Sequence, residues 1–487
     1  MKRIFVNTSI YTMSTILPKA VGFVLLPIYT RFLSPEEYGI IGAMVVFQTI
    51  LGVLFSLCLE RSIPRLYWDY KTEEERKIFL GTITISIFLI SVVLLAFLFI
   101  FQSYVGRLYK SIEFHPFYIY AIGISFVSIF SLVPEAYLLI KEKAGALAVL
   151  SLSNFVVNAG LILWFIIVEG EGAVGYLKAL MLGAVVFLPL YIYLTLKTVI
   201  FRFKPAIFRD CLEFSLPIIP TIITSWVLTY SDRIFIERYL RLEDVGIYAL
   251  GYKLASIIGI FCGAFSRAFT PTFFNFATRN DARAREVIGQ SNNFYMIVLM
   301  MMCFAMALFS KEIIILFDER YAETYRYLPL ISFSFLFSQG TGITSKFFQQ
   351  SKKMLPNMSI SIFSAVLNGF LNFILIPPYG IYGAVYATIL SYAFCFLGGY
   401  AYTKRNCFFI PLDLKTGSLF IVYATAICVI FEYGRQANFF LLFALKSAVF
   451  IVMAVLFIKK YFYPLKKLVS GKDLAESEID MEHSVGI

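Results

Sequence analysis

The sequence predicts an all-α polytopic membrane protein that crosses the bilayer about fourteen times and carries no soluble catalytic domain. Of its 487 residues, 59% are hydrophobic, only 15% are charged, and the mean hydropathy is +0.79. Soluble domains average about 25% charged residues, so a chain of this composition lacks the polar surface that they need. Apolar runs also recur along the whole chain, most of them near the ~20 residues that span a hydrocarbon core.

Each apolar run is predicted to form one helix. Several contain Gly or Pro, which spanning helices tolerate better than soluble helices do. The first run follows two basic residues, as in a signal peptide, but it is too long and no small-residue cleavage site follows, so we interpret it as a spanning helix. The runs lie at residues 7–29, 39–59, 79–101, 117–140, 145–168, 174–196, 213–236, 246–268, 292–310, 328–348, 354–376, 382–403, 417–432 and 439–458.

The distribution of Lys and Arg predicts the orientation. With the N-terminus placed in the cytoplasm, the cytoplasmic segments hold roughly threefold more Lys and Arg than the outer segments. Both termini are therefore expected to be cytoplasmic, and the protein is expected in the cytoplasmic (inner) membrane. This bias accounts for the formal charge of +11 without any nucleic acid as partner.

An internal repeat relates the two halves of the chain. Residues 31–40 (RFLSPEEYGI) match residues 238–247 (RYLRLEDVGI) at an offset of 207, with Arg, Leu, Glu, Gly and Ile identical. Residues 172–175 (GAVG) match residues 380–383 (GIYG) at an offset of 208. Each repeat holds six helices, an even number, so both halves begin on the same side of the membrane and form a parallel repeat.

We therefore predict an N-lobe at residues 1–207 and a C-lobe at residues 208–404. Two additional helices follow at 405–460, and residues 461–487 form a cytoplasmic tail. The first helix of each lobe contains two prolines, Pro18 and Pro27 in one and Pro217 and Pro220 in the other, and both helices are expected to be broken. Matched interruptions of this kind are typical of a transport site between repeats.

Six basic residues lie at membrane depth, where a charge costs about 2.5–3.5 kcal/mol on insertion scales. Two of them are expected to reach an interface, because no polar residue was found beside them in helical register. The other four are expected to face a polar cavity. The two expected at an interface are Lys178 and Lys446, and the four expected to face a cavity are Lys19, Arg233, Lys253 and Arg267.

Three of these helices have a polar face in the sequence. Thr8, Thr12, Thr15 and Lys19 recur at helical spacing, as do Thr221, Ser225, Thr229 and Asp232, and Lys253, Ser256, Gly263 and Arg267. Lys253 and Arg267 would stand about 21 Å apart along their helix. The pattern favours a positively charged vestibule that suits an anion such as a pyrophosphate. Alternatively, the hydroxyls bond to their own backbone and the cations lie at opposite interfaces.

Acidic residues at membrane depth are fewer, and two of them adjoin an arginine. Neighbouring residues point about 100° apart on a helix, so these pairs are not expected to neutralise themselves. We assign substrate binding to Lys19, Arg61, Arg233, Lys253 and Arg267. Asp232, Glu135 and Glu60 are the candidates for ion coupling.

The sequence offers little support for other chemistry. Its two histidines and seven cysteines show no zinc-type spacing, and Gly-rich phosphate loops and nucleophile elbows are missing. The longest loops stay under about 20 residues, whereas a membrane glycosyltransferase or polymer ligase would be expected to carry its acids and bases on a larger loop. We therefore expect no metal, no cofactor and no enzymatic activity.

Four segments resemble one family. Residues 25–31 (LLPIYTR), 230–236 (YSDRIFI), 245–249 (VGIYA) and 376–384 (IPPYGIYGA) are similar to Wzx-type polysaccharide flippases, and the resemblance covers the first twelve helices. It implies a two-lobed transporter that works by alternating access. Its implied substrate is an undecaprenyl-pyrophosphate-linked oligosaccharide, moved to the outer leaflet for a surface polysaccharide such as an O-antigen.

The resemblance further implies that the last two helices shape a groove for the lipid tail, and it admits a polysaccharide polymerase and chain-length machinery as partners. The same superfamily contains lipid II flippases and multidrug efflux transporters, and both remain alternatives. The first helix departs from the efflux pattern, because it carries Lys19 and no carboxylate for cation coupling. A membrane enzyme of glycan assembly is the alternative from another class.

Overall fold

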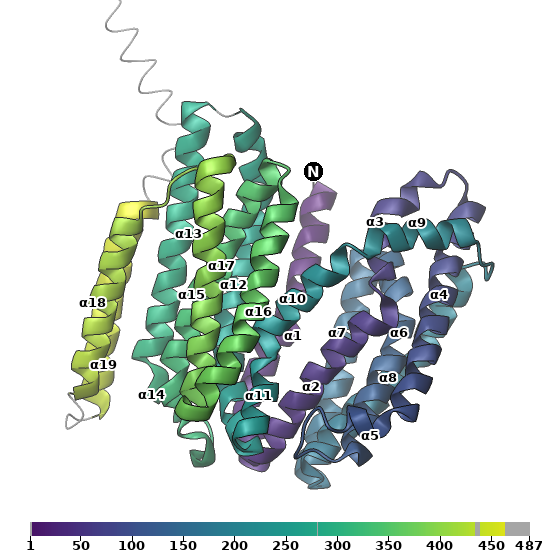
Figure 1. The fold of residues 1–487 in the computed structure, drawn as a ribbon, viewed down its shortest axis with the longest axis horizontal. Coiled ribbons are helices and arrows are strands. Elements are labelled where there is room, and N and C mark those ends of the chain that lie inside the picture. Colours follow the sequence, from purple (N-terminus) through teal and green to yellow (C-terminus); the bar gives the residue numbers. More distant parts are fainter. Residues whose placement is uncertain (1, 280, 434–438, 463–487) are drawn as a thin grey trace, which may run out of the picture. The chain divides into compact units, whose positions relative to one another are not determined.

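The chain folds into α-helices connected by short loops (Figure 1). The structure is a computed structural model, and it describes residues 2–279, 281–433 and 439–462. The long helices are α1 (Lys2–Phe32), α2 (Pro35–Ser56), α4 (Glu73–Ile100), α6 (Ile119–Ile140), α7 (Ala144–Leu163), α8 (Gly172–Thr198), α10 (Ile218–Tyr230), α12 (Leu242–Arg279), α13 (Ala282–Leu308), α15 (Thr324–Gln350), α16 (Met354–Tyr379), α17 (Ile381–Asn406), α18 (Leu414–Tyr433) and α19 (Phe439–Phe457). The shorter ones include η1 (Leu59–Ser62), α5 (Gln102–Val105), α9 (Pro205–Ser215), α11 (Asp232–Tyr239) and α14 (Ser310–Ile314).

The predicted all-α fold is confirmed, with helix at each of the fourteen predicted positions. Helix ends are less accurate, because hydropathy marks the apolar run and not the end of the hydrogen-bonded helix. The run at 246–268 belongs to α12, which continues to Arg279, and the run at 292–310 belongs to α13, which begins at Ala282. The segment between these runs was expected to be a loop, and most of it is helical.

Ten helices of the described part are long and apolar enough to cross a membrane, or eleven if the bent pair α9 and α10 forms one span. Helices α1, α15 and α18 are not among the ten. In α15, polar side chains such as Ser332, Ser334 and Gln339 lower the mean hydropathy. The chain is a multi-pass membrane protein.

The prolines act differently in the two repeats. Helices α9 and α10 meet at a bend of 42° beside Pro217, so the predicted break is confirmed there. The predicted break in the first helix is wrong, since α1 continues through Pro18 and Pro27. A proline removes one hydrogen bond and tilts a helix, and the flanking turns of a spanning helix can keep the remaining bonds.

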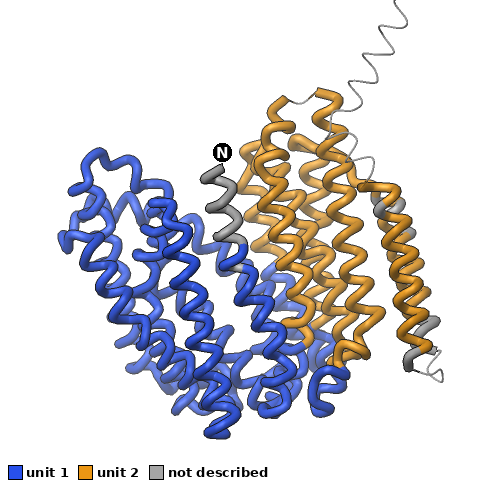
Figure 2. The backbone as a smooth tube through the Cα atoms, turned by 180° about the vertical axis from the view of Figure 1, so that it is seen from behind, with its two compact units in different colours: residues 1–250, 315–323, 365–384 blue, residues 251–314, 324–364, 385–487 orange. Residues whose placement is uncertain are grey.

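Contacts divide the chain into two compact units that do not follow the predicted lobe boundaries, and those boundaries stay a prediction. Unit 1 contains Met1–Leu250, Ile315–Glu323 and Ala365–Ala384, and unit 2 contains the rest (Figure 2). In unit 1, α2 packs against α4, α6 and α8, and α7 packs against α1 and α8. Its core is a cluster of buried aliphatic and aromatic side chains that includes Met44, Phe47 and Phe55.

Helix α2 begins with a capping box that the sequence encodes. The Ser34 hydroxyl accepts a hydrogen bond from the backbone N–H of Glu37, and the Glu37 carboxylate accepts one from the N–H of Ser34. Together these bonds satisfy two N–H groups that the start of a helix would leave unpaired. With Pro35 at the first helical position, they place the start of α2 four residues before the predicted apolar run.

The glycines at matching repeat positions face each other inside unit 1. A Cβ atom at Gly39 would stand 2.1 Å from the carbonyl oxygen of Leu242, and one at Gly246 would stand 1.9 Å from that of Pro35. The nearest atoms at both positions belong to the backbone, so no flexible side chain can move aside to make room. Only glycine permits this crossing of α2 and the first turns of α12.

We expect Gly39→Ala and Gly246→Ala each to destabilise the protein by about 1–3 kcal/mol, the usual cost of forcing extra atoms into a packed core. Thermal unfolding of the purified protein in detergent measures the loss. Gly52→Ala is the matched control, because it lies on the same helix α2 and its Cβ would meet no atom within 4 Å. Equal melting temperatures for Gly39→Ala and Gly52→Ala would contradict the close crossing.

A distant segment, Ile315–Glu323, also belongs to unit 1. Arg320 donates to the backbone carbonyls of Thr30 and Arg31 at 3.3 and 3.0 Å, and the hydroxyl of Tyr321 donates to the carbonyl of Leu33 at 3.1 Å. These carbonyls lie at the end of α1, where a helix has no partners of its own. Arg320 also donates to Asp318, and this hydrogen bond lowers the pKa of the Asp318 carboxyl.

Unit 2 is built around α13, which packs against α15, α18 and α19. Lys446 of α19 forms a buried ion pair with Glu312 of α14, at 2.7 Å, with 6% and 10% of the two side chains exposed. The partner of Lys446 therefore comes from a distant segment, and the prediction that Lys446 reaches an interface stays a prediction. In unit 1, Lys178 of α8 forms an ion pair at 2.6 Å with Glu171, which lies directly before that helix. The sequence analysis missed this neighbour.

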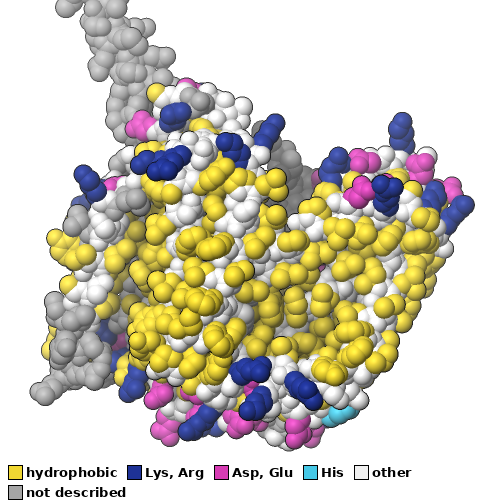
Figure 3. Space-filling model, in the orientation of Figure 1, with side chains coloured by type: hydrophobic (Ala, Val, Ile, Leu, Met, Phe, Trp, Pro, Cys, Tyr) yellow, Lys and Arg dark blue, Asp and Glu magenta, His cyan; other side chains and the backbone are white. Residues whose placement is uncertain are grey.

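The surface matches a bilayer environment. On the face shown in Figure 3, hydrophobic side chains cover the middle of each unit, and Lys, Arg, Asp and Glu gather at its ends. Large apolar side chains stay exposed along whole helices, as Val93 and Ile100 of α4 and Ile451 and Leu456 of α19 do. Such continuous exposure of apolar surface is typical of contact with lipid.

The predicted orientation can be tested by labelling single cysteines in a cysteine-free background. Ser103, exposed in α5, is expected to react from the outside, and Lys71, exposed before α4, only from the cytoplasm. Asn438 and Lys472, predicted outside and inside respectively, lie outside the described residues, and the same labelling tests them. Labelling of Asn438 from the cytoplasm would contradict a count of fourteen spans.

Candidate functional site

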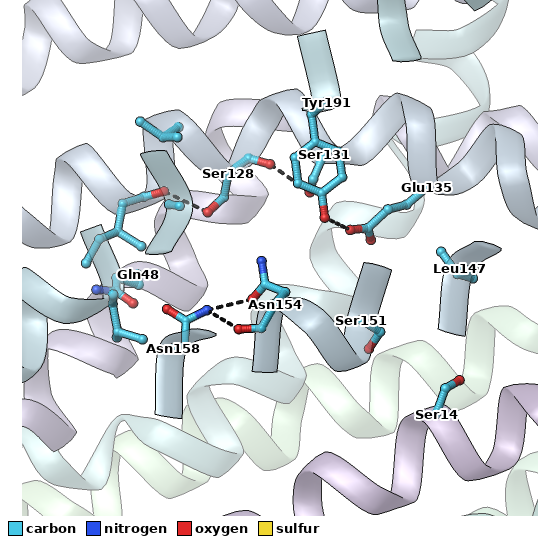
Figure 4. Close-up of a pocket in the computed structure, with 14 residues that line it drawn as sticks. Ser14, Gln48, Ser128, Ser131, Glu135, Leu147, Ser151, Asn154, Asn158 and Tyr191 are labelled. Carbon is cyan, nitrogen blue, oxygen red and sulfur yellow. Dashed lines mark hydrogen bonds between the residues drawn. The ribbon is translucent and has the colours of Figure 1, made fainter. Parts of the chain in front are cut away.

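The most prominent polar feature of unit 1 is a cavity of about 530 Å³ inside its helical bundle (Figure 4). The polar lining residues come from α1, α2, α6, α7 and α8, and most of them are uncharged amides and hydroxyls. Apolar residues such as Ile124 and Leu180 complete the wall. The polar residues are Ser14, Gln48, Ser128, Ser131, Glu135, Ser151, Asn154, Asn158 and Tyr191.

Hydrogen bonds between and within helices hold the polar groups of this cavity in place. Tyr191 of α8 donates to the carboxylate of Glu135 of α6 at 2.8 Å. Asn154 and Asn158 lie one turn apart on α7. The amide of Asn158 donates to the side-chain oxygen of Asn154 at 2.6 Å and to its backbone carbonyl at 2.9 Å. Figure 4 shows both arrangements. Glu135 is the predicted site residue that lines this cavity.

A second polar cluster surrounds Asp232 and Arg233 at the start of α11, and both residues are buried. The Asp232 carboxylate accepts hydrogen bonds from the Tyr248 hydroxyl and from the backbone N–H of Arg233. The Arg233 guanidinium lies 3.8 Å from that carboxylate and donates to the carbonyl of Thr229 at 3.1 Å. Adjacent residues can therefore pair here, contrary to our expectation, because the long arginine side chain reaches back along the helix.

Two asparagines of α16 extend this cluster, and the sequence analysis missed them. Asn368 accepts from the Ser231 hydroxyl and from the amide of Asn372, both at 3.1 Å. Nδ2 of Asn368 and Oδ1 of Asn372 are buried and have no hydrogen-bond partner among the described residues. Their spacing of four residues within a predicted apolar helix is the signal that could have identified them.

The other predicted residues of unit 1 lie apart from the cavity. Glu60 and Arg61 of η1 form an ion pair at 3.6 Å, with 55% of the Arg61 side chain exposed. This pair also forms between adjacent residues, contrary to expectation. Lys19 is exposed on α1 and is not part of the cavity lining. The side chains of Thr8, Thr12 and Thr15, predicted to share its face, lie outside the described part of the chain.

In unit 2, Lys253 and Arg267 are both exposed on α12, as a vestibule or an interface would require. The hydroxyl of Ser256 donates to the carbonyl of Lys253 at 2.6 Å. In unit 1, Ser225 and Thr229 donate to carbonyls one turn earlier, at 3.0 and 2.7 Å. For these hydroxyls the alternative interpretation is correct, since each bonds to its own helix.

Comparison with known families now places the chain. Residues 4–277 match the sequence model of the family described as polysaccharide biosynthesis protein, which is more than half of the chain. The chain belongs to the polysaccharide biosynthesis protein family. Residues 217–374 also match the MatE family. The two matches agree with the resemblance found in the sequence.

Two curated relatives are similar to this chain over part of their length. One is "Lsg locus putative protein 1" of Haemophilus influenzae, 25% identical over 56% of this chain and 66% of the relative. The other is "Probable low-salt glycan biosynthesis flippase Agl15" of Haloferax volcanii, 25% identical over 38% of this chain and 40% of the relative. The chain thus spans less than two thirds of the length of these curated relatives.

Solved structures confirm the fold of this chain. A lipid II flippase, MurJ, in an inward closed conformation aligns with a TM-score of 0.72 and 14% identity, covering 92% of this chain and 99% of the other. An inward-facing multidrug transporter of the MATE family aligns with a TM-score of 0.61 and 16% identity, covering 82% and 97%. At these identities the comparisons establish the polytopic helical fold and not the substrate.

Proposed function

We propose that this protein is a flippase that moves an undecaprenyl-pyrophosphate-linked oligosaccharide from the cytoplasmic to the outer leaflet by alternating access of its two predicted lobes. The observation that carries the proposal is the cavity of unit 1. Sugars cannot cross a hydrocarbon core without hydrogen-bonding partners, and the cavity supplies uncharged amides and hydroxyls at membrane depth. Membership of the polysaccharide biosynthesis protein family supports the same class of substrate.

A cavity in unit 2 suits the lipid part of such a substrate. Its volume is about 230 Å³, and methionine, leucine and phenylalanine side chains dominate its lining. The lining includes Met296 and Met300 of α13, Phe337 of α15 and Phe396 of α17, together with Gly417 and Ile421 of α18. The polyprenyl chain needs only apolar contact, and flexible Met side chains adapt to its shape. This placement supports the predicted role of α18 in contacting the tail.

The charged residues complete the proposal. Lys19, Arg61, Arg233, Lys253 and Arg267 are proposed to attract the pyrophosphate, because a phosphate group needs cationic or N–H partners when it leaves water. The membrane is proposed to be the cytoplasmic membrane, with both termini in the cytoplasm. A polysaccharide polymerase and chain-length machinery are proposed partners.

Reconstitution of the purified protein into liposomes tests the function. A fluorescent polyprenyl-pyrophosphate oligosaccharide is added to the inner leaflet, and its appearance outside is followed by lectin capture or chemical reduction of the dye. We expect transfer that depends on the protein. Lipid II and a cationic dye serve as the comparison substrates, since these are the alternatives that the superfamily offers. Faster transfer of either comparison substrate than of the oligosaccharide would contradict the proposal.

Asp232 is the proposed coupling residue, ahead of Glu60 and Glu135, because it is buried at the start of α11 and has both a cation and the Tyr248 hydroxyl as partners. In the same liposomes, Asp232→Asn is expected to transfer substrate slowly and without dependence on a proton or sodium gradient. The change keeps the shape and removes the charge. Unchanged gradient dependence would leave Asp232 only the role of orienting Arg233.

A further inference from the structure

We propose that the cavity of unit 1 binds the sugar portion of the substrate and selects glycans without carboxylate groups, that is, neutral or amino sugars. This inference rests on the proposed function and specifies its substrate. It begins from the chemistry of the lining. An amide offers both a donor and an acceptor, and so does a sugar hydroxyl, so the three amides Gln48, Asn154 and Asn158 match a polyhydroxylated ligand.

Two of these amides have unused hydrogen-bonding capacity. Nε2 of Gln48 and Oδ1 of Asn158 are buried, and neither has a partner among the described residues. An unsatisfied buried polar atom is unfavourable, and a bound hydroxyl within hydrogen-bonding reach would remove that penalty. One of these atoms is a donor and the other an acceptor, so hydroxyl groups, which both accept and donate, can satisfy both. The cavity volume of about 530 Å³ is within the ~300–1,000 Å³ typical of pockets for small ligands.

Asn158 is held in position by its surroundings. A Cβ atom at Gly183 of α8 would stand only 2.1 Å from the Oδ1 atom of Asn158. The absence of a side chain at Gly183 therefore leaves the space that this amide occupies. The Nδ2 atom of Asn158 is engaged by Asn154. The Asn158 side chain is therefore fixed before a ligand arrives, and a fixed group loses less entropy on binding than a free one.

The charge of the lining sets the selectivity. Among the described residues that line the cavity, Glu135 is the one carboxylate, and none is Lys or Arg. A uronic acid or other acidic sugar would place a second carboxylate near Glu135 with no cation to compensate. A neutral sugar meets no such repulsion, and an amino sugar gains an attraction. For the same reason the pyrophosphate is expected to stay outside this cavity.

The test uses three lipid-linked probes that share the polyprenyl pyrophosphate and differ in the outer sugar: an N-acetylhexosamine, an amino sugar and a uronic acid. We expect wild-type protein in liposomes to transfer the first two at least ~10-fold faster than the third, which corresponds to about 1.4 kcal/mol. Glu135→Gln is expected to remove most of this difference. The double variant Asn154→Leu, Asn158→Leu is expected to slow the two favoured probes about tenfold. Ser153→Leu, exposed on the same helix and absent from the lining, is the matched control.

Binding is measured independently of transport. Saturation-transfer NMR on the full-length protein in detergent uses soluble N-acetylhexosamine and uronic acid disaccharides as probes. We expect transfer to the first, which the double asparagine variant abolishes and Ser153→Leu preserves. Binding without transport in liposomes would support the sugar site and overturn the flippase. Transport that is equal for all three probes and unaffected by the cavity variants would overturn the sugar site and leave the flippase. Absence of both binding and transport would overturn both proposals.

Discussion

Lys446→Met is expected to destabilise the protein by about 3–5 kcal/mol, because it leaves the Glu312 carboxylate buried without its cation. Only 10% of the Glu312 side chain is exposed, and its second oxygen already has no hydrogen-bond partner among the described residues. Lys446 belongs to α19 and Glu312 to α14, so the pair ties the last described long helix to the middle of the chain. Equilibrium unfolding of the detergent-solubilised protein measures the loss.

Removing both charges is the diagnostic comparison. The double variant Glu312→Met, Lys446→Met is expected to recover most of the lost stability, since two apolar side chains of similar volume often replace a buried pair without cost. Arg209→Gln is the control. It breaks a pair with Glu213 of nearly equal length, 2.8 Å, but with 80% and 62% of the side chains exposed, and should cost at most about 1 kcal/mol. A double variant no more stable than Lys446→Met would contradict this account.

Arg233→Glu is expected to be similarly severe, with a loss of about 3–5 kcal/mol and a large drop in the yield of folded protein. The change removes the cation beside the Asp232 carboxylate and places a second carboxylate there, where only 2% of the Asp232 side chain is exposed. Folded yield and melting temperature of a fluorescent fusion, separated by size-exclusion chromatography, provide the measurement.

A comparison of Arg267→Glu with Arg233→Glu separates the effect of burial from the effect of charge reversal. The sequence alone predicts that both charge reversals insert normally, because both arginines were assigned to a water-filled vestibule. The structure buries Arg233 and exposes Arg267, so we now expect Arg267→Glu to change stability by no more than about 0.5 kcal/mol. The double variant Asp232→Asn, Arg233→Gln should be more stable than Arg233→Glu. Equal folded yields for Arg233→Glu and Arg267→Glu would refute the role of burial.

Much of the candidate site could not be predicted from the sequence. Asp232, Arg233 and Glu135 were identified because a charge within an apolar run is visible in one dimension. Asn368 and Asn372 were missed because an uncharged amide costs less within a spanning helix than a charge does. Its presence in an apolar run therefore does not by itself indicate a site. The cavity was missed because its polar residues come from five helices, and no single helix shows their convergence.

The matched glycines are an example of a contact that the sequence repeat does not predict. The repeat aligned Gly39 with Gly246, but nothing in the alignment indicates that the two residues touch. Their contact depends on how α2 crosses α12, which is a property of packing and not of either segment. The same applies to Lys446, whose partner Glu312 is 134 residues away.

The sequence by itself determined the fold class, the approximate position of every long helix and the family. These features follow from local quantities, such as the length of an apolar run and the residues of short motifs. Only the tertiary structure decided which charges are buried, which residues pair and where the polar cavity lies. Burial and pairing arise when distant helices meet, and their energies depend on distances between side chains that a linear pattern does not contain.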